Sequence, residues 1–176
     1  LADTLDAARA NQDARATKLP AEFDVVVCGA GTSGCTLAGR LAEAGLRGAL
    51  IEAGDWDTAP TVLDPGKWFF NLGTERDWGD VAVPTASVNG RAIASHMGRV
   101  VGGGSSINAT IWVRPPRADL DGWAEIAGDK AWGYDAALKI FTGRVENWQG
   151  PASPYRGKGG KVWMQVAADP PPIAPA

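Results

Sequence analysis

Three glycines at a fixed spacing, Gly29, Gly31 and Gly34, form the pattern in this sequence that is tied most directly to chemistry. In the spacing Gly-x-Gly-x-x-Gly, the first glycine allows a sharp bend and the second lets backbone approach a pyrophosphate. The third lets a helix pack closely on a strand. The amides of the first helical turn have no partner inside the helix and point at the phosphates, so no lysine is needed. The pattern therefore predicts a phosphate-binding turn.

The elements that must position this turn are visible on both sides of it. Val25 to Val27 form a β-branched run typical of a strand buried on both faces of a parallel sheet. A helix-forming stretch follows Gly34, and a second strand ends at Glu52, 18 residues after that glycine. This is close to the spacing of about 20 expected for a carboxylate that accepts hydrogen bonds from a ribose, and it favours FAD or NAD over NADP. The alternative is a strand–helix–strand unit whose glycines serve packing alone.

A second run of small residues, 98–115 (GRVVGGGSSINATIWVRP), can line the other half of a long, flat cofactor. Its glycines, serines and asparagine expose backbone amides along a path that no bulky side chain blocks. The alternative is a flexible linker. That alternative is disfavoured because flanking apolar residues such as Val100 and Trp112 need burial.

The overall composition excludes several classes of protein. A length of 176 residues allows one domain with a core, and a net charge of −3 with interspersed signs argues against nucleic acid and anionic membrane surfaces. No apolar run approaches the ~20 residues of a membrane span. Cys28 and Cys35 are expected to be small buried residues, and no metal site is predicted. Unpaired cysteines favour the cytoplasm, while the absence of an initial methionine leaves a secreted or periplasmic location open.

The flanking parts of the chain are expected to carry regular elements. We predict an N-terminal extension over 1–22 with a helix over 4–16, and core-packing helices over 119–127 and 134–145. A strand is expected over 161–167. Four prolines in 170–176 make the tail over 169–176 irregular.

The stretch 55–97 has no clear period and is predicted to be a loop that lies along an extended ligand. Within it, Asn89-Gly90 is expected to form a tight turn between strands at 81–83 and 91–94.

Together, the two glycine segments resemble the N-terminal, FAD-binding part of the glucose–methanol–choline (GMC) oxidoreductases. The matching motifs are 24–34 with 52–54, 98–115, Asp77-Trp78, Pro84, 89–91, 121–123 and 132–134. The resemblance covers essentially everything after residue 22. It implies an α/β, FAD-linked Rossmann-type fold, with the FAD-binding domain over 23–168 and the tail leading toward a substrate domain.

The resemblance also implies cofactor contacts residue by residue. The pyrophosphate would be held by Gly29, Gly31, Thr32, Ser33 and Gly34, and the adenosine ribose by Glu52, with Ala53 beside it. The ribityl chain and isoalloxazine would lie beside Val101, Gly103, Gly104, Asn108, Ala109, Thr110 and Ile111. Some members tether FAD through a histidine in this segment. Here Ile107 and Asn108 occupy those positions, so FAD is expected to be non-covalent.

The family's catalytic pair, a histidine with a second histidine or asparagine, lies near the far C-terminus of much longer chains. Nothing after His96 can act as that base, so no catalytic residue is predicted in this chain, which alone should be inactive. We expect it to be one piece of a split or nicked protein, completed by a second polypeptide with the substrate domain and catalytic histidine. A truncated piece of a longer chain is the alternative.

The implied function is oxidation of an alcohol CH–OH group by hydride transfer to flavin N5. A hydroxynitrile lyase and a fatty acid photodecarboxylase share the fold and are alternatives. A NAD-dependent domain is disfavoured because it has no need of segment 98–115. The residues that select the substrate, and with it the identity of the small-molecule alcohol, belong mostly to the substrate domain.

Overall fold

The computed structural model describes residues 2–166, so the predicted tail over 169–176 lies outside the described residues. The chain divides into two compact units, Leu1–Ile111 and Trp112–Ala176. The first unit opens with α1 (Ala2–Ala16), which confirms the predicted N-terminal helix.

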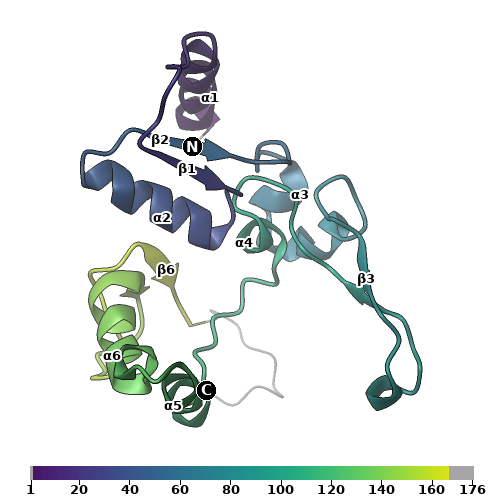
Figure 1. Ribbon diagram of the computed structural model, residues 1–176, viewed down its shortest axis with the longest axis vertical. Helices are drawn as coiled ribbons and strands as arrows, with labels where there is room; N and C mark the ends of the chain where they lie inside the picture. The colour runs from purple at the N-terminus through teal and green to yellow at the C-terminus, as the bar shows by residue number, and fades with distance from the viewer. Residues whose placement is uncertain (1, 167–176) are drawn as a thin grey trace. The chain divides into compact units, whose positions relative to one another are not determined.

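The predicted strand, glycine turn, helix and second strand are confirmed. They are β1 (Val25–Cys28), α2 (Thr32–Glu43) and β2 (Gly48–Ile51). The two strands pair in parallel with Val25 opposite Gly48 and Cys28 opposite Ile51, and α2 connects them (Figure 1). Because the carboxyl ends of both strands meet at one edge, the glycine turn and Glu52 are brought to the same edge.

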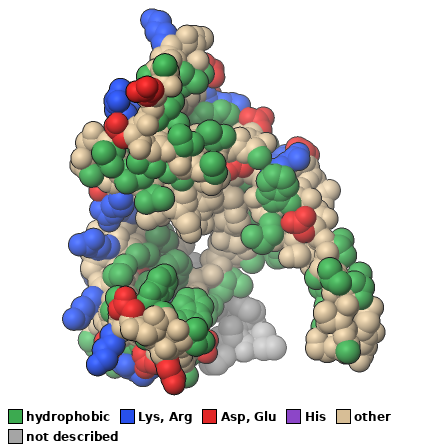
Figure 2. Space-filling view, in the orientation of Figure 1, with side chains coloured by type: hydrophobic (Ala, Val, Ile, Leu, Met, Phe, Trp, Pro, Cys, Tyr) green, Lys and Arg blue, Asp and Glu red, His purple; other side chains and the backbone are tan. Residues whose placement is uncertain are grey.

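The expected burial of β1 on both faces is wrong for the described residues. Val27 is buried, but Val26 is 53% exposed, and in the paired strand β2 Ile51 is 56% exposed. Cys28 and Cys35 are exposed too, which corrects their prediction as buried residues. The described part of this sheet holds two strands, so both are edge strands, and the side chains that a wider sheet would cover remain accessible. Figure 2 shows apolar side chains at the surface over α2 and over the β3 hairpin.

The prediction that residues 55–97 form a loop is wrong in part. They contain five short elements: α3 (Pro60–Leu63), η1 (Pro65–Asn71), β3 (Asp80–Ala82), η2 (Ala86–Val88) and β4 (Ile93–Ser95). Asn71 is fully buried and its amide donates to the carbonyls of Thr61 (2.9 Å) and Trp68 (3.1 Å). By donating to these two carbonyls, the Asn71 side chain holds α3 and η1 together. Hydrophobic periodicity gives no signal for such a polar contact.

The predicted hairpin is present with shifted strands. β3 and β4 pair antiparallel, from Asp80 opposite Ser95 to Ala82 opposite Ile93, so each strand lies one or two residues from its predicted range. Asn89 (φ 56°) and Gly90 (φ 68°) both adopt the left-handed conformation, which confirms the turn that this pair predicts. The first unit ends with α4 (Gly104–Ile107), inside the second small-residue segment.

The second unit contains both predicted helices. They are α5 (Arg117–Ala127), which ends at Gly128 with φ 64°, and α6 (Tyr134–Ile140), which continues as a π-helical turn, η4 (Phe141–Val145). The short turn η3 (Lys130–Trp132) connects them. The apolar face predicted for 119–127 is only partly buried, because Leu120 is 6% exposed and Ile126 is 88% exposed. The predicted strand over 161–167 is shorter: β6 (Val162–Met164) pairs in parallel with β5 (Glu146–Trp148), and residue 167 lies outside the described residues.

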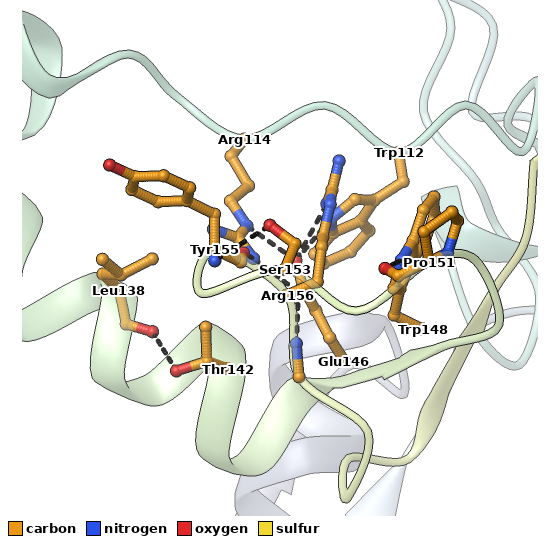
Figure 3. Close-up of polar contacts among 11 residues, drawn as sticks. Trp112, Arg114, Leu138, Thr142, Glu146, Trp148, Pro151, Ser153, Tyr155 and Arg156 are labelled. Atoms are coloured by element: carbon orange, nitrogen blue, oxygen red, sulfur yellow. Dashed lines mark hydrogen bonds and ion pairs between the residues drawn. The ribbon is translucent and has the colours of Figure 1, made fainter. Parts of the chain in front are cut away.

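A fully buried carboxylate, Glu146, forms the centre of the second unit (Figure 3). It accepts hydrogen bonds from Arg114 Nε (2.6 Å) and Nη2, from Arg156 Nη1 (3.2 Å), from Trp112 Nε1 (3.2 Å) and from the Gly157 amide (3.1 Å). Burial raises the pKa of Glu146, but the hydrogen bonds from Arg114, Gly157 and Trp112, together with the charge of Arg114, outweigh burial and leave that pKa below its ordinary value. The charged form is therefore the stable one at neutral pH.

No helix in residues 2–166 is long and apolar enough to cross a membrane.

Candidate functional site

A cleft of about 890 Å³ in the first unit brings the two glycine segments together. It is lined by Cys28, Gly29, Gly31, Thr32, Ser33, Gly34, Ile51, Glu52, Ala53, Trp78, Asp80, Met97, Gly98, Gly103 and Gly104. All of the site residues predicted in the first glycine segment and at the end of the second strand are in this set. The cleft is therefore the candidate site.

The first wall of the cleft is the turn between β1 and α2. Gly29 has φ 93°, and a Cβ atom added to Gly34 would lie 1.9 Å from the Gly29 carbonyl oxygen. The helix can pack this closely on the turn only because position 34 has no side chain. The amides of Thr32, Ser33 and Gly34 begin α2 without partners inside the helix, and the first turn holds no acidic residue. This helix end is suited to bind phosphate.

Glu52 connects the second strand to the turn. Its half-buried carboxylate accepts a hydrogen bond from the Ala30 amide (2.7 Å) at one oxygen and from the Gly54 amide (2.9 Å) at the other. A carboxylate has about four acceptor sites, so two remain for hydroxyl groups of a ligand. Glu52 thus both fixes the glycine turn and keeps capacity for a ribose.

The second small-residue segment lies directly against the first. The Gly102 amide donates to the Ala30 carbonyl (2.7 Å), and Gly31 and Gly102 form an isolated parallel β-bridge. A Cβ atom added to Gly103 would lie 2.8 Å from the Gly31 Cα. The two glycine segments therefore form one continuous surface of bare backbone, which an elongated, flat ligand can approach closely.

Five of the predicted residues are not among those that line the cleft: Val101, Asn108, Ala109, Thr110 and Ile111. Val101 is half-buried, and its amide donates to the Asp55 carbonyl (2.9 Å). Asn108 follows α4 and accepts the Thr110 amide at Oδ1 (2.7 Å). Thr110 has φ 56°, a rare conformation for a β-branched residue. The roles of these five residues remain predictions.

The other wall holds residues that the sequence analysis did not assign to the cofactor. Trp78, Asp80, Met97 and Gly98 line the cleft from the two ends of the β3–β4 hairpin. The Trp78 amide donates to the Met97 carbonyl (2.9 Å), which joins those ends. For two of these four residues the sequence contains a signal: Trp78 belongs to a matching motif, and Gly98 begins the second small-residue segment.

Asp77 and His96 lie behind this wall. The Asp77 side chain is inaccessible to solvent, and its carboxylate forms a hydrogen bond of 2.5 Å with Nδ1 of His96. Hydrogen bonds from the Gly73 amide, followed by those from Gly79, His96 and Met97, outweigh burial and hold the pKa of Asp77 well below its usual range. His96, 39% exposed, is held at Nδ1 by this carboxylate. Across the described residues, no group of three or more His, Cys, Asp or Glu side chains is arranged to hold a metal ion.

The donor set of the cleft fits a dinucleotide. The unpaired amides at the start of α2 suit phosphates, the spare acceptor sites of Glu52 suit a ribose, and the glycine-lined faces accept a ligand without steric conflict. The described residues bring no nucleophile–base pair into this cleft. The arrangement suits binding and orientation of a cofactor.

Curated relatives share the same region. The chain is 36% identical over 146 residues to a protein named oxygen-dependent choline dehydrogenase from Brucella ovis, a match that covers 82% of this chain and 26% of the relative. A protein of the same name from Vibrio vulnificus is 37% identical over 142 residues, covering 80% of this chain and 25% of that one. The chain thus spans about a quarter of the length of these relatives.

Solved structures are also similar to this chain over most of its length. Pyridoxine 4-oxidase from Mesorbium loti superposes with a TM-score of 0.74 at 34% identity, covering 81% of this chain and 28% of that one. Formate oxidase from Aspergillus oryzae superposes with a TM-score of 0.71 at 27% identity, covering 81% of this chain and 26% of that one. Residues 23–169 match the family model described as GMC oxidoreductase, and this match, with the cleft built from the two glycine segments, places the chain in the GMC oxidoreductase family.

Proposed function

We propose that this chain is the FAD-binding part of an oxidoreductase that acts on an alcohol. The observation that carries the proposal is the direct contact of Gly103 with Gly31 in the lining of a cleft that also holds Glu52 and the amide-rich end of α2. The family and the flavoenzymes among its solved members support FAD as the cofactor.

The residues of this chain bind and orient the cofactor. The amides of Thr32, Ser33 and Gly34 hold the pyrophosphate, and Glu52 holds the adenosine ribose, with Ala53 beside it. When bound, FAD supplies the redox chemistry by accepting the hydride of the alcohol carbon at its N5. The cofactor is held without a covalent bond, because Ile107 and Asn108 stand where a tethering histidine would be required.

The alcohol proton is taken by a group outside these 176 residues. His96 is the single histidine of the chain, and it is not among the residues that line the cleft. We propose that the substrate domain and its catalytic histidine lie outside these 176 residues, which span about a quarter of the length of the curated relatives.

Flavin spectroscopy tests the function. The purified protein is expected to show flavin absorbance bands and to release FAD, identified by mass, on denaturation. Under anaerobic conditions, a panel of primary alcohols that begins with choline and pyridoxine, the compounds named for two relatives, should contain one that bleaches these bands. Turnover of a substrate with the flavin left oxidised indicates a lyase and contradicts alcohol oxidation. A preparation that neither carries nor takes up FAD contradicts the proposal as a whole.

A further inference from the structure

The buried Asp77 carboxylate collects hydrogen bonds from three separate stretches of backbone. It accepts the amides of Gly73 (2.8 Å), Gly79 (3.1 Å) and Met97 (3.1 Å). A fourth hydrogen bond, 2.5 Å long, joins the carboxylate to Nδ1 of the His96 ring. The turn before β3, the start of β3 and the chain leaving β4 are therefore fixed to one another by a single side chain.

The stretches that Asp77 fixes form one wall of the cleft. Trp78, Met97 and Gly98 line it, and each lies next in the chain to Asp77 or to one of its partners. Asp77 and Gly98 also form an isolated antiparallel β-bridge. A shift of the carboxylate would therefore move residues that face the ligand.

This wall is in direct contact with the glycine segments. A Cβ atom added to Gly98 would lie 2.3 Å from the Gly103 carbonyl, and one added to Gly103 would lie 2.8 Å from the Gly31 Cα. No side chain separates these three backbones, so little can absorb a displacement between them. The position of Gly98 thus sets how closely Gly103 lies on the phosphate-binding turn.

We propose that Asp77 is a positioning residue for the cofactor. Its carboxylate holds the wall formed by Trp78, Met97 and Gly98 against Gly103, and this fixes the width of the cleft that receives FAD. The inference rests on the proposed function, and it adds a residue that does not itself line the cleft.

The chemistry of the site predicts the consequence of removing the charge. An asparagine at position 77 has nearly the same shape, but it offers one acceptor oxygen and one NH2 donor. That donor faces backbone amides that are donors themselves, so buried N–H groups lose their partner. Asp77→Asn should therefore weaken FAD binding by about tenfold or more, which corresponds to the loss of one or more buried hydrogen bonds.

The matched control is Asp24→Asn. Asp24 also fixes backbone in the first unit, since it accepts the Arg47 amide (2.8 Å), but it is more exposed and does not line the cleft. The experiment measures the FAD dissociation constant of the apoprotein by flavin fluorescence, quenching of bound flavin by iodide, and the apoprotein unfolding midpoint. The full chain is used, with any polypeptide that copurifies.

Asp77→Asn is expected to raise the FAD dissociation constant and to make the bound flavin more accessible to iodide, while Asp24→Asn leaves both at the wild-type value. Wild-type affinity and quenching in Asp77→Asn would overturn the inference. A wild-type apoprotein that binds no FAD would instead overturn the proposed function, so the two failures are distinguishable.

A milder pair of variants applies if Asp77→Asn does not fold. His96→Ala removes one of the four hydrogen bonds to the carboxylate, whereas His96→Gln keeps a donor that can reach it. His96→Ala should raise the FAD dissociation constant, and His96→Gln should restore it toward the wild-type value. Equal, wild-type affinities in both variants would contradict the inference.

Discussion

Gly103 lies so close to Gly31 that a Cβ atom on Gly103 would be 2.8 Å from the Gly31 Cα. The two residues are 72 positions apart in the sequence, and each belongs to a different small-residue segment. Their contact converts two separate glycine patterns into one cleft. FAD binding is expected to depend on this contact.

Gly103→Ala should strongly weaken FAD binding, because the new methyl group meets backbone and not a movable side chain, and because position 103 has φ 56°. Gly39→Ala is the matched control. Gly39 lies in α2 with nothing within 4 Å of an added Cβ, so this change should raise stability by about 1 kcal/mol. Fluorescence titration with FAD and thermal unfolding check both variants. Equal FAD affinity in the two variants would contradict the tight contact.

Glu52→Gln should weaken FAD binding and also loosen the glycine turn. A glutamine retains one acceptor oxygen, so either the Ala30 or the Gly54 amide loses its partner, at a cost of ~1–3 kcal/mol. The control is Glu22→Gln, at an exposed position before β1. Calorimetric titration with FAD is the measurement, and an unchanged dissociation constant in Glu52→Gln would exclude a role for this carboxylate.

Glu146→Gln should destabilise the second unit by ~3–5 kcal/mol, because it leaves two arginines without their buried counter-charge. Urea unfolding at neutral pH measures the effect. A loss comparable to that of Asp64→Asn, which removes the exposed ion pair between Asp64 and Lys67, would show that the buried cluster contributes little.

The pH dependence of the same variant has a defined sign. The pKa of Glu146 lies below its ordinary value of 4.5, so the carboxylate contributes stability fully above that pH. The contribution is lost as pH falls below 4.5 through the pKa of the folded state. The difference in unfolding free energy between wild type and Glu146→Gln should therefore be constant from neutral pH to about 5 and shrink below it. A difference that shrinks already between pH 7 and about 5 would contradict the lowered pKa.

The parts of the fold that could be predicted from sequence are those governed by local rules. The spacing of Gly29, Gly31 and Gly34 specifies a strand–turn–helix unit, and Asn89-Gly90 specifies a turn, because each requires backbone conformations or close approaches that few other residues allow. Gly128 ended a helix for the same reason.

The parts that sequence reasoning missed depend on long-range polar contacts. Asp77 meets Met97 across 20 positions, and Glu146 meets Arg114 across 32. Neither contact has a periodic signature, so the hydrogen bonds that hold the wall of the cleft and the centre of the second unit emerged only from the structure. Burial of β1 was mispredicted because periodicity describes which residues are apolar and not how many strands cover them.

Cys28 tests most directly whether the cleft lined by Gly31 and Gly103 binds FAD. This exposed thiol lines the cleft, whereas the exposed Cys35 does not. The measurement is the rate of thiol alkylation in Cys35→Ala and in Cys28→Ala, with and without saturating FAD. Bound FAD should slow alkylation of Cys28 in proportion to the fraction of protein that is occupied and leave Cys35 unaffected. If Cys28 reacts equally fast in protein that fluorescence shows to be saturated with FAD, the cofactor lies elsewhere and the account is wrong.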